Sequence, residues 1–242
     1  MKEKVKDMVT RVRVALDEIT GVDVDSDFVG DMNLEIEQAL LTAATELSEE
    51  LPDHLLMPTT MRVVETGLNR AVPFESPAEH GWSNTDGTGW IALPADFLRF
   101  VSLRLSSWTQ DVRVIIDTAS NEGRMQASTW TRGTPQKPRV MLGGVRAVLN
   151  TVSNETETRR ELLYYTAGKS GNNYQHEVET FSYVPMPEIE TNEEDTPPTK
   201  YLDAGLHDRA IPLIVNRACA IILEAKQNTA LAERFRAMSA VS

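Results

Sequence analysis

Residues 93–105 read LPADFLRFVSLRL, and the alternation within this stretch indicates a β-strand. The apolar residues are Val101, Leu103 and Leu105, and the residues between them, Ser102 and Arg104, are polar. Successive side chains on a strand point to opposite faces, so this pattern is typical of a strand that is buried on one side. The stretch therefore predicts a β-sheet in the middle of the chain.

The sequence around this strand keeps a β-like composition from residue 59 to residue 185. Glycine, proline, threonine, valine and aromatic residues dominate, and short apolar runs are separated by turn residues. We expect further strands at 138–142, 145–151, 162–165 and 177–184, with Gly143-Gly144 as a hairpin turn and 168–173 as a loop. A short helix is expected within 117–130, although Gly123 disfavours it.

Helical periodicity marks both ends of the chain. Apolar residues recur at intervals of three and four from Val5 to Ile19, and Gly21 is suited to end that helix. A second helix, capped by Asp31 or Asn33, is expected to end before Pro52. A third helix is expected from Leu206 to Ala225, with Pro212 in its first turn.

These segments predict an α+β fold, in which a helical bundle carries an inserted β-rich region. The bundle is expected to combine an antiparallel N-terminal helix hairpin with one long C-terminal helix. Its expected parts are residues 1–58 and 201–228, and the insertion is 59–185. Residues 186–200 contain five acidic side chains and several prolines, so we interpret them as an exposed acidic linker. Residues 229–242 are left as a C-terminal tail.

The composition restricts the class of protein. The chain has 242 residues and 41% hydrophobic residues, enough for a sizeable core, and no apolar run approaches the length of a membrane span. We therefore expect a soluble protein made in a cytosol, with its single cysteine, Cys219, packed in the core. The formal net charge of −12 disfavours nonspecific binding to phosphate backbones and suits protein partners better.

Three motifs suggest chemistry but depart from the patterns that the chemistry requires. Gly168-Lys169-Ser170 resembles the end of a phosphate-binding loop, yet Leu163 replaces the glycine expected five residues earlier. The series Asp23, Asp25 and Asp27 resembles the start of a calcium loop that lacks its glycine and its final glutamate. His176-Glu177 lacks the second histidine of a zinc-protease helix. We therefore predict no catalytic, cofactor-binding or metal-binding residues.

Aromatic residues are the most prominent remaining feature of the middle region. All four tryptophans, Trp82, Trp90, Trp108 and Trp130, fall within 49 residues. Large rings of this kind occur in cores, in subunit interfaces and in ligand sites. We favour a core or a subunit interface, because nearby arginines and lysines form only a modest basic patch.

The order of residues between 88 and 142 resembles the head-to-tail connector proteins of tailed bacteriophages, the adaptor or neck ring proteins, including those of crAss-like phages. The residues that carry the resemblance are Leu93-Pro94, Asp96-Phe97-Leu98-Arg99, Val101 to Leu105, Trp108, Gln126, Trp130, Gly133-Thr134-Pro135 and Lys137-Pro138. The resemblance is weaker in the helices on either side.

The resemblance implies a structural virion protein in the neck between capsid and tail, made in the cytoplasm of the host bacterium. It implies a cyclic homo-oligomer of twelve copies that docks on the portal protein, contacts downstream tail or neck proteins, and forms part of the DNA channel. Genomic DNA would pass without specific binding, and no enzyme activity, cofactor or membrane is implied.

The resemblance also implies that the C-terminal tail docks onto the portal or a neighbouring subunit. The expected apolar stripe of that tail is Leu231, Phe235 and Met238, flanked by Arg234 and Arg236. A frayed terminus is the alternative. Two other functions stay open: a nucleotide-dependent assembly factor or hydrolase that uses Gly168-Lys169-Ser170, and another minor capsid or tail attachment protein.

Overall fold

The structure is a computed structural model that describes residues 2–20, 29–52, 56, 62–65, 80–83, 88–128, 130–149, 156–166, 178–204 and 206–240. The chain divides into two compact units. Unit 1 contains Met1–Met61 and Val184–Ser242, and unit 2 contains Arg62–Tyr183. Unit 2 is therefore inserted between the two segments of unit 1.

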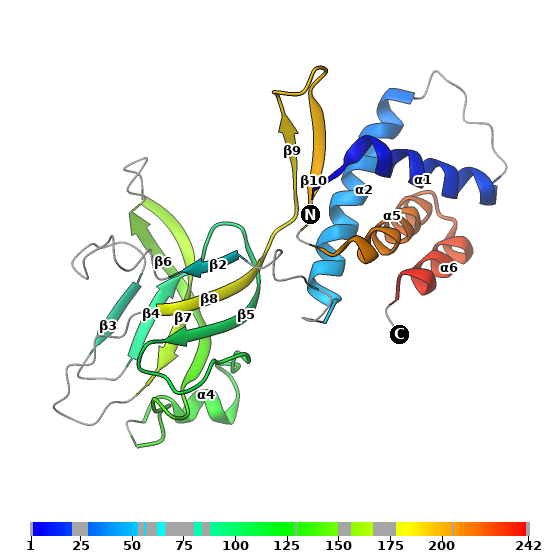
Figure 1. The fold of residues 1–242 in the computed structure, drawn as a ribbon. Coiled ribbons are helices and arrows are strands. Elements are labelled where there is room, and N and C mark those ends of the chain that lie inside the picture. The colour runs from blue at the N-terminus through cyan, green and yellow to red at the C-terminus, as the bar shows by residue number, and fades with distance from the viewer. Residues whose placement is uncertain are drawn as a thin grey trace. The chain divides into compact units, whose positions relative to one another are not determined.

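The helices of unit 1 pack around α5 (Ile211–Ala225). The other helices are α1 (Val5–Thr20), α2 (Val29–Glu50) and α6 (Thr229–Ser239), and a short 3₁₀ turn, η4 (Asp208–Ala210), precedes α5. Ala218, Cys219 and Ala220 of α5 are completely buried, since α1, α2 and α6 all contact this helix. Figure 1 shows α1 crossing α2, so these two helices do not form the expected antiparallel hairpin.

The expected long C-terminal helix is also absent, because α5 begins only at Ile211, after η4, and the chain turns after Ala225. Gln227 adopts a left-handed conformation with φ of 60°, and the amide of Asn228 donates to the carbonyl oxygen of Leu223. The following helix, α6, then packs back on α5 through Ala232 and Phe235. Most of the predicted tail is therefore part of the folded unit.

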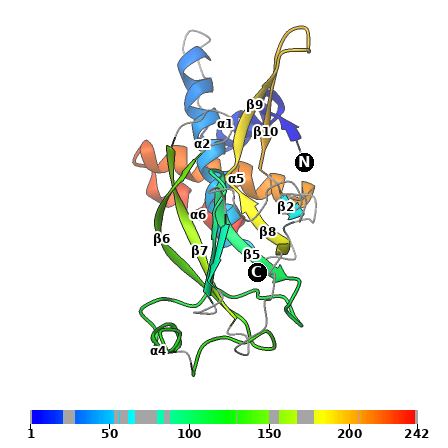
Figure 2. The ribbon, with the colours of Figure 1, turned by 90° about the vertical axis from the view of Figure 1, so that its left-hand side faces the viewer.

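A three-stranded antiparallel sheet belongs to the same unit. Its order is β1-β10-β9, formed by β1 (Lys2–Lys4), β10 (Thr199–Asp203) and β9 (Glu188–Asn192). The expected acidic linker, 186–200, is thus mostly a β-hairpin, in which β9 and β10 run side by side (Figure 2). Leu202 at the end of this hairpin is 2% exposed and fixes β10 to the unit.

Unit 2 consists of two further antiparallel sheets. One has the order β2-β8-β5, with β2 (Arg62–Glu65), β8 (Val178–Pro185) and β5 (Phe97–Leu105). The other has the order β3-β4-β7-β6, with β3 (His80–Ser83), β4 (Thr88–Ala92), β7 (Thr156–Tyr165) and β6 (Arg139–Leu149). A short helix, α4 (Asn121–Met125), lies between β5 and β6 in the chain.

The two sheets of unit 2 share one core. Side chains from both sheets, and Leu93 and Trp108 from the adjoining loops, meet there; the sheet residues are Ile91, Leu103, Leu105, Val140, Leu162, Tyr164, Val178, Phe181 and Tyr183. Phe97, Phe181 and Tyr183 form a group of neighbouring rings with centroids 5.4 to 6.4 Å apart. The alternation at Val101, Leu103 and Leu105 is confirmed, since all three are buried and the residues between them are not.

The predicted turn at Gly143-Gly144 is wrong, because β6 continues through both glycines. The register with β7 shifts between Leu142 and Val145, which is the signature of a β-bulge. A side chain at Gly143 would collide with Glu161 and Leu163 of β7. Close approach of the neighbouring strand, and not a tight turn, therefore accounts for this glycine.

The predicted fold class is therefore wrong. The described residues form a mixed α and β fold with three antiparallel sheets, one of them within the helical unit. Two shorter helices, α5 and α6, replace the single long C-terminal helix. The pairing of β1 with β10 joins residues that are about 200 positions apart, such as Glu3 and Leu202, and local periodicity carries no signal for it.

Candidate functional site

Trp130 is the most exposed large apolar side chain among the described residues, at 94%. It lies in the tryptophan loop, defined here as residues 117–138, which follows β5 and leads into β6. Met125 in the same loop is 50% exposed. Exposed tryptophans are unusual on isolated proteins and are enriched at the centres of protein interfaces.

A buried glutamine holds the tip of the tryptophan loop closed. Gln126 is only 3% exposed; its amide nitrogen donates to the carbonyl oxygen of Glu122 at 2.9 Å, and its amide oxygen accepts from the backbone N–H of Gly133 at 2.9 Å. The Nε of Arg132 donates to the backbone carbonyl oxygen of Gln126 at 2.8 Å. The hydroxyl of Thr131 donates to the backbone carbonyl oxygen of Met125 at 2.5 Å. These bonds join Met125 and Gln126, which precede Trp130, to Thr131, Arg132 and Gly133, which follow it.

The start of α4 is fixed in a similar way. The Ser120 hydroxyl oxygen caps the helix by accepting from the amide of Gly123 at 3.0 Å, and a carboxylate oxygen of Asp117 accepts from the amide of Ala119 at 3.0 Å. Gly123 is buried against the preceding backbone, where any side chain would overlap the carbonyl oxygen of Asp117. The glycine that weakens the helix in sequence terms is thus required by this packing.

The loop is joined to the sheet at both of its ends. Before the loop, the Ile116 amide donates to the carbonyl oxygen of Val140 on β6 at 2.8 Å. In its second half, Gly133 packs so closely against the carbonyl oxygen of Tyr165 on β7 that it has no room for a side chain. Trp130 is therefore presented on an ordered support, and binding a partner through it needs little ordering of the loop.

The structure separates the tryptophans that the sequence groups together. Trp108 is 3% exposed and meets the buried ring of Tyr164 edge-on, with centroids 6.1 Å apart. Burial raises the pKa of Tyr164 far above its ordinary value, so this ring stays neutral. Trp90 is half-buried, and the side chain of Trp82 lies outside the described residues. Trp108 is therefore a core residue, whereas Trp130 is available to a partner.

A second surface of unit 2 is a pocket of about 510 Å³ beside the loop that joins β4 to β5. Pairing between β4 and β7 ends at Ala92 and Glu161, and the amide of Leu93 then donates to the carbonyl oxygen of Arg160 at 2.8 Å. The pocket opens where the two strands separate. Its apolar lining is Leu93, Pro94, Phe97 and Leu98, and Arg159 and Arg160 line its other side.

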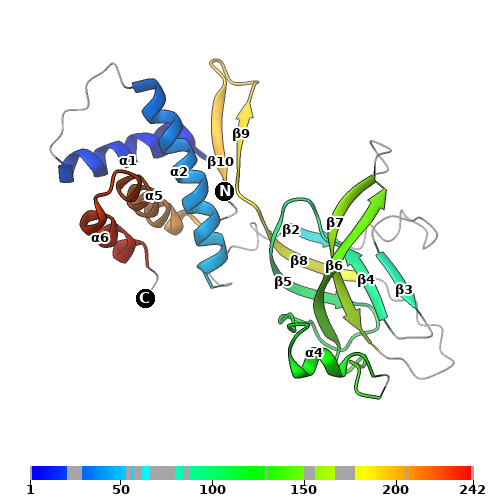
Figure 3. The same ribbon diagram turned by 180° about the vertical axis from the view of Figure 1, so that it is seen from behind.

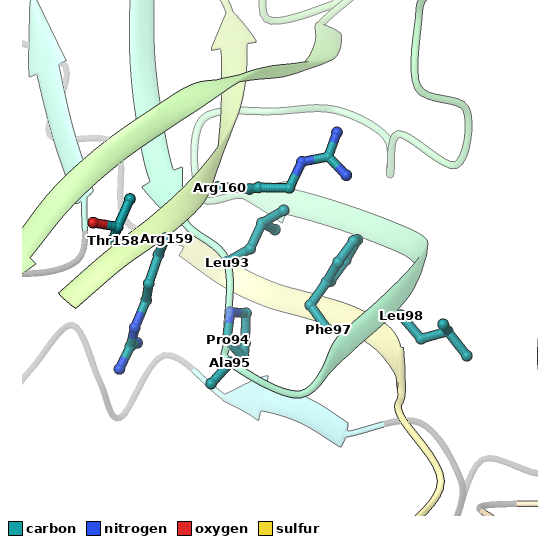
Figure 4. Close-up of a pocket in the computed structure, with 8 residues that line it drawn as sticks. All are labelled: Leu93, Pro94, Ala95, Phe97, Leu98, Thr158, Arg159 and Arg160. Carbon is teal, nitrogen blue, oxygen red and sulfur yellow. The ribbon is translucent and has the colours of Figure 1, made fainter. Parts of the chain in front are cut away.

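The side chains of the two arginines of this pocket diverge from β7, as those of adjacent residues on a strand do (Figure 4). Arg160 extends past Leu93 and Phe97, and Arg159 extends past Pro94. Arg160 is exposed and Arg159 is half-buried. Sequence reasoning missed this site, although two adjacent arginines in a strand were a visible signal.

The predicted tail residues do not form one exposed stripe. Phe235 is 2% exposed and packs within unit 1, whereas Met238 is 52% exposed. Arg236 forms a two-pronged ion pair with Glu224 of α5, at 2.5 and 2.9 Å, and this pair lowers the pKa of Glu224 and raises that of Arg236. Leu231 is half-buried and Arg234 is exposed. Phe235 and Arg236 therefore hold α6 on α5.

Most of the motifs considered for chemistry lie outside the described residues, namely Gly168-Lys169-Ser170, Asp23, Asp25, Asp27 and His176-Glu177. His207 lies within them, and its Nδ1 accepts from the amide of Arg209 at 3.0 Å, as a cap of η4. Across the ranges given above, no group of three acidic, histidine or cysteine side chains could hold a metal ion. None of the helices described is long and apolar enough to cross a membrane.

Comparison with known proteins identifies no family. No family model matches the sequence, and no curated protein is significantly similar to it.

Proposed function

We propose that this chain is a head-to-tail connector protein, which assembles into a ring, docks on the portal and joins the capsid to the tail. The observation that carries the proposal is Trp130, which is 94% exposed on a loop that Gln126, Thr131 and Arg132 hold in place. A tryptophan presented in this way suits a permanent contact with another protein of the assembly. The resemblance of residues 88–142 to connector proteins supplies the kind of assembly.

The distribution of charge supports a role beside DNA that does not involve binding it. Unit 1 has 11 basic and 23 acidic residues, so it accounts for the whole net charge of −12, and unit 2 has 13 of each. An acidic surface repels the phosphate backbone, and a channel wall of this kind lets DNA slide past. We assign unit 1 to the channel side of the ring on this basis.

The test of assembly is the native mass of the purified chain, alone and mixed with the portal ring encoded by the same genome. We expect a discrete multi-subunit ring or a stable complex with the portal. Trp130→Ala should weaken that assembly about thirtyfold, since interface tryptophans commonly contribute 2 kcal/mol or more, about thirtyfold in affinity. It should leave the thermal stability of the monomer unchanged, because the side chain is exposed.

Val145→Ala is the matched control, because Val145 is also an exposed apolar residue of unit 2, at 66%, outside the tryptophan loop. This variant should assemble like the unaltered chain. A chain that stays monomeric and ignores the portal would contradict the proposal. Assembly that is unaffected by Trp130→Ala would remove the observation that carries it.

A filter-binding titration with double-stranded DNA tests whether unit 1 lines a channel without binding the genome. We expect no salt-sensitive affinity at physiological ionic strength. Tight binding that weakens as salt is added would contradict the assignment of unit 1 to the channel wall.

A further inference from the structure

The pocket beside Leu93 has the chemistry of a site for an acidic peptide segment. Its floor is apolar, and Arg159 and Arg160 place one guanidinium on either side of β7 (Figure 4). A guanidinium offers several N–H donors in a plane and pairs with carboxylates in a two-pronged geometry. A volume of about 510 Å³ accommodates a few side chains, and not a folded domain.

A segment with the complementary charge projects from unit 1 of the same chain. The hairpin segment from Glu188 to Asp203 has six acidic residues and one basic residue, Lys200, which is paired with Glu37 of α2 at 2.7 Å. Its turn, residues 193–198, reads EEDTPP and stands clear of the helices in Figures 1 and 3. Glu193 and Glu194 are exposed there, as are Pro197 and Pro198.

Contacts within the hairpin give this turn a defined shape. The Tyr201 hydroxyl donates to a carboxylate oxygen of Asp195 at 3.1 Å, and the side-chain oxygen of Asn192 accepts from the amide of Glu194 at 3.2 Å. The bond to Asp195, with some burial, raises the pKa of Tyr201. The Asp195 side chain is therefore bonded within the hairpin, whereas the side chains of Glu193 and Glu194 are exposed.

We infer that the acidic turn of one copy docks in the arginine pocket of the next copy around the ring. Glu193 and Glu194 pair with Arg159 and Arg160, and Pro197 and Pro198 cover the apolar floor formed by Leu93, Pro94 and Phe97. This inference rests on the proposed function, because it needs a ring. Two different surfaces that fit each other head to tail form the type of contact that closes a cyclic assembly of identical subunits.

Charge reversal with exchange of partners tests the contact. The pocket variant carries Arg159→Glu and Arg160→Glu, and the hairpin variant carries Glu193→Lys and Glu194→Lys. Each variant alone should need at least about tenfold more protein to reach half-assembly, since like charges then face each other across the contact. A mixture of equal amounts of the two should assemble again, because each reversed surface meets its opposite charge on a neighbouring copy.

Two further variants control for the change in net charge. Arg113→Glu alters another exposed residue of unit 2, and Glu233→Lys alters another exposed residue of unit 1. Both should assemble normally. Tryptophan fluorescence, which reports only unit 2 because all four tryptophans lie there, and helical circular dichroism confirm that each variant is folded.

The outcomes separate this inference from the proposed function. If the unaltered chain forms no ring, the proposed function fails first. If the ring forms and both reversed variants assemble normally, only the docking contact is overturned. Restored assembly in a single chain that carries all four changes, with no restoration in the mixture, would place the contact within one chain and also overturn the inference.

Discussion

Arg217 is a charged residue in the core of unit 1, with only 6% of its surface exposed. It extends from α5 to three partners on two other helices. Its guanidinium meets Glu50 at 2.5 Å and Glu46 at 3.1 Å, both on α2, and its Nε donates to the hydroxyl of Ser239 on α6 at 3.1 Å. One side chain therefore links α2, α5 and α6.

We predict that Arg217→Ala lowers the free energy of unfolding of unit 1 by about 2 kcal/mol. Breaking a fully buried ion pair costs more, about 3–5 kcal/mol, but Glu46 and Glu50 remain 34% and 55% exposed and regain water. Urea unfolding followed by helical circular dichroism measures the change. Arg236→Ala, which removes the exposed pair with Glu224, should cost less than about 1 kcal/mol, and equal losses for the two variants would contradict this account.

Cys219 is a buried thiol whose pKa is raised to about 12 by burial. Its sulfur lies 3.9 Å from the carbonyl oxygen of Val12 on α1. A thiol reacts as the thiolate, whose fraction in the native protein at about pH 8 is very small compared with that of an unfolded thiol of ordinary pKa near 8.5. We predict that a thiol reagent labels Cys219 only after unfolding.

The raised pKa of the Cys219 thiol determines how the stability of unit 1 changes with pH. The pKa of the thiol is higher in the folded state than in the unfolded state, so the stability that this group contributes is complete below about pH 8.5. It is lost as the pH rises from there toward 12. Urea midpoints of unit 1 should fall across this range, less so in a Cys219→Ala variant, and rapid labelling of the native protein at about pH 8 would show that the thiol is accessible.

At the scale of elements, α4 depends on a glycine for its position. We predict that Gly123→Ala destabilises unit 2 by about 1–3 kcal/mol, the usual cost of forcing an extra methyl group into a packed site, because the methyl group would overlap the Asp117 carbonyl oxygen. Thermal unfolding followed by tryptophan fluorescence measures this. Gly144→Ala is the control, since nothing lies within 4 Å of the added methyl group. A larger loss of stability for Gly144→Ala than for Gly123→Ala would show that the tryptophan loop accommodates a methyl group at position 123.

The elements that the sequence predicted well are those with a local signal. The first helix was expected from Val5 to Ile19 and is found as Val5–Thr20, and the second ends at Glu50, before Pro52. Pro212 lies in the first turn of α5 as expected. In contrast, sequence reasoning predicted a linker where β9 and β10 form a hairpin, because residues 186–200 contain several prolines, five acidic residues and few apolar side chains.

The whole molecule carries unit 2 as an insertion whose two ends are neighbours. Arg62 and Tyr183, the first and last residues of the unit, are paired across β2 and β8. The unit also has its own core between its two sheets. A unit with adjacent ends and a separate core needs little from the rest of the chain in order to fold.

We therefore predict that a fragment of residues 62–183 folds on its own and unfolds cooperatively. Its tryptophan fluorescence should match that of the full chain, because all four tryptophans belong to it and Trp108 packs against Tyr164 inside it. A complementary chain in which a short glycine-serine linker replaces residues 62–183 should keep its helical circular dichroism. A fragment that lacks a cooperative transition would show that unit 2 depends on unit 1.

Local sequence patterns are sufficient to predict the helices at both ends and the strand at Val101 to Leu105, and a count of charges shows the excess of acidic residues. These features depend on residues a few positions apart, or on composition alone, so periodicity and counting reveal them. The sequence also favoured a core or an interface for the tryptophans, but it could not tell that Trp108 is buried and Trp130 exposed.

Contacts between distant segments become visible only in the folded chain. The sheet that joins β1 to β10, the bond between Leu93 and Arg160 that shapes the pocket, and the bonds of Gln126 that expose Trp130 all connect the backbone or side chains of distinct segments. Such pairings are selected by the packing of the complete chain, in which many weak contacts act together, and no short pattern of residues encodes them.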